Sequence, residues 1–157
     1  MISKVIFKNI KFNNINPNKF DKYIIKNGLF VFPAGPALAS IHKSKIYYNS
    51  LQKADFVFFD SGFFVLLLKI FKNINVYKFS GYKFLSLFFN YLKKNKKKSI
   101  FLINPNLNFS KSNQSYLKSL GIKKINNYLA PKYKIKNLSD RKLLKLLKRI
   151  KPNFIII

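Results

Sequence analysis

Hydrophobic residues occur in short runs that are separated by turn residues. Continuous apolar runs such as "LFVF" and "DFVFF" are typical of strands buried on both faces of a sheet. The opening stretch "KVIFKNIKF" instead alternates apolar and polar residues, which predicts one or two short strands with one exposed face. The pattern therefore predicts strands within residues 4–12, 29–32, 55–59, 75–79, 97–103 and 152–157.

Between these runs the apolar positions follow the spacing of helices. Leu38, Ile41, Tyr48 and Leu51 keep this spacing as far as Lys53, and a proline precedes them where a helix would begin. Other helices are predicted over residues 20–25, 63–71, 82–94, 112–121 and 140–150, the fourth of these ended by Gly121 and the last capped by Ser139 or Asp140.

Strand, turn and helix thus alternate along the chain. This order predicts an α/β fold with a mainly parallel sheet and helices on both of its faces, which gives three layers. An α+β arrangement is the alternative. The chain has 157 residues, of which 48% are hydrophobic and 18 are phenylalanine, so it can bury a sizeable core. We expect a single domain over residues 1–157.

The formal net charge of +27 favours anionic partners, such as nucleic acid, acidic lipid or nucleotide phosphates. All but two of the 31 basic residues are lysines, and Lys, Phe, Ile, Asn and Tyr share A/T-rich codons. Genome composition is therefore an alternative source of the charge. Arginine reads phosphates and bases with two hydrogen bonds, and it occurs only at Arg141 and Arg149, which disfavours nucleic acid.

Other residue types exclude several kinds of site. The chain has no cysteine or glutamate and only one histidine, His42, which argues against disulfides, a zinc or iron site and a Ser-His-Asp triad. No apolar run reaches the roughly 18–20 residues of a spanning helix, and the N-terminus lacks the pattern of a signal peptide. These features predict a cytoplasmic protein.

Four turns fall where predicted strands end, at residues 33–36, 60–62, 80–81 and 104–106. Ligands of parallel α/β sheets bind at this edge, and helix N-termini there favour anions. Asp60 is one of only four acidic residues and lies in the second turn. It has two interpretations: a base whose pKa is raised by partial burial, or a cap of the helix that follows.

Several motifs occur in a fixed order: "FPAGPAL" (32–38), "LQKADFVFFDSGFFVLL" (51–67), "VYKFSGYKFL" (76–85), "APKY" (130–133) and "LLKLLKRIKPNFIII" (143–157). Together they resemble the WecG/TagA/CpsF glycosyltransferases, glycosyltransferase family 26, over about residues 20–157. The branch with D-S-G is the most similar. "ADFVFFDSG" with "FSG" about twenty residues later is the specific part of the resemblance.

The resemblance implies a Rossmann-like fold and transfer of a sugar from a UDP-sugar to a lipid-linked saccharide at the inner face of the plasma membrane. This reaction belongs to surface polysaccharide synthesis. It is metal-independent and inverting, needs no cofactor, and has an aspartate as candidate base, which Asp60 matches. The substrate-binding positions implied by the resemblance are Pro33, Ala34, Gly35, Ser61, Gly62, Lys78, Ser80, Gly81 and Asn104.

Three departures from the family pattern leave alternatives open. Pro33-Ala34-Gly35 replaces a Thr-x-Asn, and Lys78 replaces an arginine. The family continues beyond a strand like "PNFIII" into a glycine turn with a Gln-Glu pair, so we expect a C-terminal truncation. The alternatives are an inactive fragment or pseudoenzyme, and a basic module that binds RNA or a membrane surface. An uncovered "FIII" edge would also favour self-association.

Overall fold

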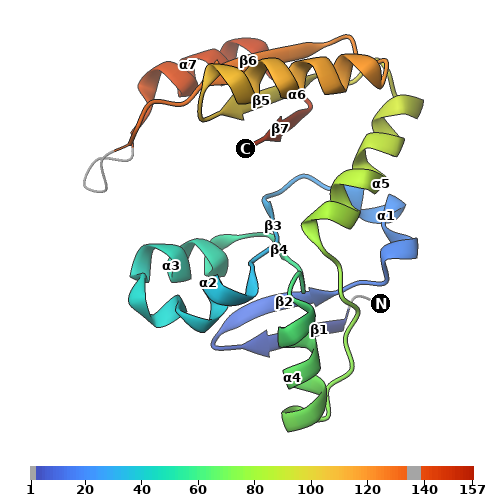
Figure 1. Ribbon diagram of the computed structural model, residues 1–157, viewed down its shortest axis with the longest axis vertical. Helices are drawn as coiled ribbons and strands as arrows, with labels where there is room; N and C mark the ends of the chain where they lie inside the picture. The colour runs from blue at the N-terminus through green and yellow to red at the C-terminus, as the bar shows by residue number, and fades with distance from the viewer. Residues whose placement is uncertain (1–2, 134–138) are drawn as a thin grey trace. The chain divides into compact units, whose positions relative to one another are not determined.

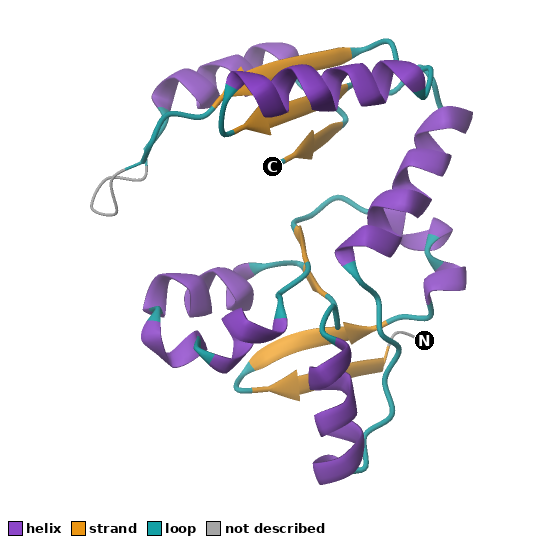
Figure 2. Ribbon diagram, viewed as in Figure 1, coloured by secondary structure: helices purple, strands orange, loops and turns teal. Residues whose placement is uncertain are grey.

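The computed structural model describes residues 3–133 and 139–157 and divides the chain into two compact units, Met1–Phe88 and Phe89–Ile157 (Figures 1 and 2). Helix α5 (Gly81–Lys94) begins in the first unit and ends in the second. Each unit contains strands and helices, so each is described by itself. The expectation of one domain over residues 1–157 stays a prediction.

The first unit is built on a four-stranded sheet in the order β1-β2-β4-β3. Strands β1 (Ser3–Phe7) and β2 (Ile10–Asn14) form the predicted antiparallel opening pair. The two residues that join them, Lys8 and Asn9, both have positive φ, as a tight hairpin turn requires. Strands β3 (Phe30–Val31) and β4 (Phe56–Val57) are much shorter than their apolar runs and pair in parallel.

Short helices surround this sheet. The predicted helix ending at Lys53 is in fact interrupted, because the Ser40 hydroxyl bonds back to a carbonyl and the Ser44 hydroxyl caps a new helix. The elements of this unit are the 3₁₀ turns Pro17–Lys19 and Ile41–Lys43, helices α1 (Asp21–Ile24), α2 (Gly35–Ala39), α3 (Lys45–Lys53) and α4 (Gly62–Lys72), and the start of α5.

The predicted strand over residues 75–79 is wrong, because this segment forms no ladder. Its backbone is held at two points instead. The N–H of Tyr77 donates to the side chain of Asn14 at 2.8 Å, and the N–H of Phe79 donates to the carbonyl of Phe59 at 2.9 Å. A side-chain acceptor takes the place that a strand carbonyl would fill, so pairing does not propagate.

Aromatic residues fill the core of the first unit on both sides of β4. Phe58 and Phe59 are consecutive and fully buried, and in an extended chain they face opposite ways. Phe59 stacks on Phe12 with ring centroids 4.9 Å apart. Phe58 stacks on Phe32 at 4.8 Å and meets Phe79 edge-on at 5.3 Å. Val57, Phe58 and Phe59 of the run "DFVFF" are therefore buried on both faces, as predicted, whereas Asp55 is exposed and Phe56 is partly buried.

One buried amide belongs to this sheet. Asn13 in β2 is only 3% exposed, and its side-chain oxygen accepts a hydrogen bond from the N–H of Val57 at 3.1 Å. Strands β2 and β4 share a single register pair, Phe12 with Val57. The Asn13 side chain thus supplies part of the bonding that a longer ladder would provide.

The second unit has a parallel three-stranded sheet in the order β6-β5-β7. Its central strand β5 (Ile100–Asn104) carries the buried residues, and β7 (Phe154–Ile156) was predicted. Strand β6 (Ile125–Leu129) was not predicted, because its sequence "INNYL" has two asparagines, which are rare in strands. Pairing with β5 over five residues outweighs that weak local preference.

Two helices accompany this sheet. Helix α6 (Leu107–Ser119) lies alongside β5 and β6, and α7 (Arg141–Ile150) connects β6 to β7 in the chain (Figure 1). Asp140 caps α7, as predicted, by accepting from the N–H of Leu143. Gly121, with φ of +80°, ends the turn after α6.

The α/β class and the mostly parallel pairing are confirmed, but the strands form two sheets where the sequence predicted one. Within the described residues, no helix combines the length and the apolar content needed to cross a membrane.

Candidate functional site

Turns that follow β3 and β4 meet at the carboxyl ends of these parallel strands. Helix α2 begins at Gly35, and Ser61 is the residue from which α4 begins. A methyl group added at Gly35 would lie 2.7 Å from the hydroxyl oxygen of Ser61, so the two turns are in direct contact. Glycine is required here because a side chain would displace the hydroxyl that caps α4.

Asp60 does not cap α4, the helix that follows it, and its carboxylate bonds instead to the start of α5. The hydroxyl of Ser61, not the Asp60 carboxylate, accepts from the N–H of Phe64 and caps α4. One carboxylate oxygen of Asp60, Oδ1, accepts a hydrogen bond from the N–H of Gly81 at 2.9 Å. The half-buried Asp60 is thus oriented by the first residue of α5, and the structure gives its Oδ2 no donor among the described residues.

A lysine lies over the start of α4. A methyl group added at Gly62 would be 3.5 Å from Nζ of Lys78, which places this amine beside the N-terminal turn of the helix. Lys78 is exposed, and it forms no ion pair within the described residues. Free backbone N–H groups at a helix N-terminus carry a partial positive charge, and a lysine beside them increases the attraction for an anion.

Eight of the nine predicted binding positions belong to the first unit. Pro33 is buried after β3, and Ala34 precedes the first residue of α2. The Ser80 hydroxyl accepts from the N–H of Lys83 and caps α5. The structure therefore joins the 60–62 turn to the other two, through Gly35 with Ser61 and Gly81 with Asp60, and it places Lys78 beside Gly62.

The ninth predicted position, Asn104, lies at the end of β5 in the second unit. Asn104 is 2% exposed, and both ends of its amide are bonded: the nitrogen donates to Asn127 at 2.7 Å and the oxygen accepts from Asn113 at 2.8 Å. This amide chain ties β5 to β6 and to α6. The observed role of Asn104 is structural, and its role in substrate binding stays a prediction.

An apolar pocket of about 310 Å³ lies against the first-unit turns. Gly35 and Ser61 line one end, whereas Asp60 and Lys78 do not line it. Half of its lining residues come from α4, among them Phe63, Leu67 and Phe71. The sequence does not indicate this pocket, because the rest of its lining comes from α2 and from Phe7 and Lys8 at the β1–β2 turn, more than fifty residues from α4 in the chain.

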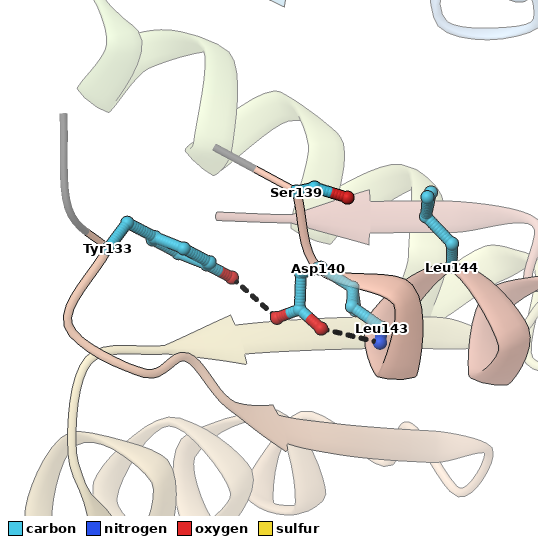
Figure 3. Close-up of a pocket in the computed structure, with 5 residues that line it drawn as sticks. All are labelled: Tyr133, Ser139, Asp140, Leu143 and Leu144. Atoms are coloured by element: carbon cyan, nitrogen blue, oxygen red, sulfur yellow. Dashed lines mark hydrogen bonds between the residues drawn. The ribbon is translucent and has the colours of Figure 1, made fainter. Parts of the chain in front are cut away.

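The second unit has a pocket of about 330 Å³ at the start of α7 (Figure 3). It is lined by Tyr133, Ser139, Asp140, Leu143 and Leu144. Figure 3 shows the Tyr133 hydroxyl donating to the Asp140 carboxylate, which also accepts from the N–H of Leu143.

A second phenol, that of Tyr128, donates to the same carboxylate oxygen of Asp140 at 2.8 Å. The N–H of Leu143, and then the hydroxyls of Tyr128 and Tyr133, hold the pKa of Asp140 below its usual 3.8, against an opposing effect of burial. The hydrogen bond to Asp140 is the main cause that raises the pKa of Tyr128 to about 12. Each hydrogen bond stays intact while Asp140 is ionised and both phenols are neutral.

This network predicts a loss of stability in acid. Because the folded-state pKa of Asp140 lies below its unfolded value of 3.8, its contribution is present above that pH and is lost as pH falls through the folded value. We expect the free energy of unfolding, measured by urea denaturation, to fall from about pH 7 to about pH 2.5. Asp140→Asn should show a smaller fall, and an equal fall in both proteins would contradict the network's role.

The described residues hold no group of three or more His, Cys, Asp or Glu side chains that could bind a metal ion. From the sequence, Tyr133 belongs to the motif "APKY" and Asp140 is a predicted helix cap, but nothing there connects the two residues with each other or with Tyr128. No signal in the sequence pairs them, because the phenols approach the carboxylate only after β6 joins the sheet.

Comparison with models of known protein families and with curated proteins gives no match to this chain.

Proposed function

We propose that the first unit binds a UDP-sugar and transfers the sugar to a lipid-linked saccharide, with Asp60 as the base. The observation that supports this most directly is the hydrogen bond from Gly81 to Asp60, which fixes a carboxylate beside the starts of two helices. The parallel pairing of β3 and β4, each followed by a helix, is compatible with a Rossmann-like fold. The motif resemblance supplies the substrate classes.

The proposed chemistry is an inverting displacement at the anomeric carbon of the donor sugar. An acceptor hydroxyl about 3 Å from Oδ2 of Asp60 gives its proton to that oxygen as the new C–O bond forms. The bond between the anomeric carbon and the β-phosphate oxygen of UDP breaks, and UDP leaves with the bonding electrons. The hydrogen bond to Gly81 keeps Oδ1 occupied, so Oδ2 is the oxygen that accepts the proton.

Positive charge stabilises the diphosphate as it leaves, and at the start of α4 the free backbone N–H groups and the Lys78 amine supply this charge. The backbone at Gly62 begins an eleven-residue helix, and the Lys78 amine lies beside it. The absence of a side chain at Gly62 lets a phosphate approach the backbone closely. Lys78 contributes charge without the two parallel hydrogen bonds of an arginine.

UDP binding measured by calorimetry tests this assignment. A hydrogen bond to a charged group contributes roughly 1.5–3 kcal/mol, so Lys78→Ala should weaken UDP binding about tenfold or more. Lys53→Ala is the matched control, because Lys53 is also exposed but lies at the C-terminal end of α3. We expect its effect to stay within about twofold.

Two results would contradict the proposal. One is that the chain binds UDP no more tightly than uridine, which would leave the diphosphate without a site. The other is that Lys53→Ala weakens UDP binding as much as Lys78→Ala, since the affinity would then reflect the overall charge of the chain.

A further inference from the structure

Helix α4 is apolar on almost every side, although the core covers only part of it. Its sequence is "GFFVLLLKIFK", and only Phe64 and Leu68 are buried. Phe63 is 69% exposed, Ile70 is 63% exposed and Phe71 is 74% exposed. A helix that is hydrophobic all round is normally enclosed by protein or lipid, so this exposure calls for a partner.

The exposed residues form one continuous strip. Phe63, Leu66 and Ile70 are spaced three and four residues apart and therefore lie on one side of the helix. Phe71 lies at the far end, where it also lines the apolar pocket. We call Phe63, Leu66, Ile70 and Phe71 the α4 strip.

Lysines border this strip at the C-terminal end of α4. Lys69 and Lys72 lie in the last turn of α4, and Lys8 in the β1–β2 turn lines the same pocket as Phe71. Neither α4 nor the β1–β2 turn contains an acidic residue. An apolar strip edged by lysines matches a surface of acyl chains beneath anionic headgroups.

We propose that the α4 strip docks this protein on a bilayer that contains acidic phospholipid. Phe63, Ile70 and Phe71 enter the boundary between headgroups and acyl chains, and Lys69 and Lys72 contact lipid phosphates. A second copy of the chain is a poorer occupant, because it carries the same charge of +27 and would bring lysines against lysines. The bilayer supplies both the apolar layer and the opposite charge.

This inference goes beyond the proposed function and does not depend on it. Gly62 and the strip belong to the same helix, whose eleven residues span about 16 Å. A docked α4 would therefore hold the Asp60 turn within roughly that distance of the lipid surface. Lipid binding is measured without nucleotide, so its failure and the failure of UDP binding are separate results.

Tryptophan reporters test the proposal on the full chain, because the chain contains no tryptophan of its own. Phe63→Trp and Phe71→Trp place the reporter in the strip, and Phe109→Trp on α6 is the control, since Phe109 is also an exposed aromatic on a helix. With vesicles of phosphatidylcholine containing about a quarter phosphatidylglycerol, we expect a blue shift and protection from acrylamide only for the two strip reporters.

Lysine variants test the electrostatic part. Each lysine near an acidic surface contributes roughly 1 kcal/mol, so Lys69→Gln with Lys72→Gln should together lower vesicle binding about thirtyfold. The matched control is Lys111→Gln with Lys118→Gln on α6, which should lower it less than about threefold.

Three results would overturn the proposal. The first is equal behaviour of all three reporters, and the second is equal loss of binding in both lysine pairs, since each would indicate attraction by overall charge alone. The third is a blue shift of the strip reporters without vesicles that grows with protein concentration, which would assign the strip to a second copy of the chain.

Discussion

Replacing Asp60 by asparagine is expected to lower the rate of sugar transfer by roughly 10²- to 10⁴-fold while UDP binding stays within a few-fold of the original. The amide keeps an oxygen that can accept from the N–H of Gly81, so the turn should retain its shape. What it loses is the negative charge that would take the acceptor's proton. Single-turnover transfer from a UDP-sugar, with calorimetry of UDP binding beside it, measures the two effects separately.

Asp55→Asn is the control for this prediction. Asp55 lies five residues earlier in the same unit, and its carboxylate likewise accepts a backbone hydrogen bond, from the N–H of Leu29 at 2.8 Å. It is not part of the three turns, so transfer should change less than about threefold. An equal loss of transfer rate in Asp60→Asn and Asp55→Asn would mean that Asp60 is not the base.

Phe58→Ala is expected to lower the free energy of unfolding by about 3–5 kcal/mol. Phe58 is fully buried, and its ring lies within 6.5 Å of the rings of four phenylalanines, Phe30, Phe32, Phe79 and Phe84. Removing it opens a cavity bounded by aromatic rings that belong to three separate segments and cannot close together. Urea denaturation followed by circular dichroism measures the change.

Phe63→Ala serves as the control for the core prediction, because Phe63 is a phenylalanine of the same unit that is largely exposed. Its replacement should change the free energy of unfolding by less than about 0.5 kcal/mol. A loss for Phe58→Ala as small as that of Phe63→Ala would mean that the aromatic cluster does not hold the unit together.

Much of the fold was predictable because apolar runs and helix caps are local signals. The opening hairpin, the helices after "DSG" and "SG", the cap at Asp140 and the last strand all follow from neighbouring residues. The two errors in the strand prediction have a common cause, which is hydrogen bonding between segments that are distant in the chain. Strand β6 forms although its asparagines disfavour it, and residues 75–79 form no strand because a side chain of β2 takes one of their bonds.

The candidate site was predictable as a set of turns but not as a set of contacts. Turn residues at strand ends indicated where Gly35 and Asp60 would gather, because parallel strands end at one edge of a sheet, whereas Gly81 contacts Asp60 although the segment before it forms no strand. The sequence could not indicate that Asp60 is held by α5 while Ser61 caps α4, since either residue can cap a helix. The exposure of the α4 strip was equally hidden, because its composition is that of a buried helix.

The amide of Asn13 has a consequence for how the first sheet assembles. If β4 shifted by one position, the N–H of Val57 and the buried oxygen of Asn13 would both lose their partner, at about 1–3 kcal/mol for each orphaned group. The phenylalanines of the core alone would tolerate a shift of β4 by one position, because one apolar ring would take the place of another. The side-chain oxygen of Asn13 therefore selects the register of β4 against β2, which the surrounding phenylalanines alone would not specify.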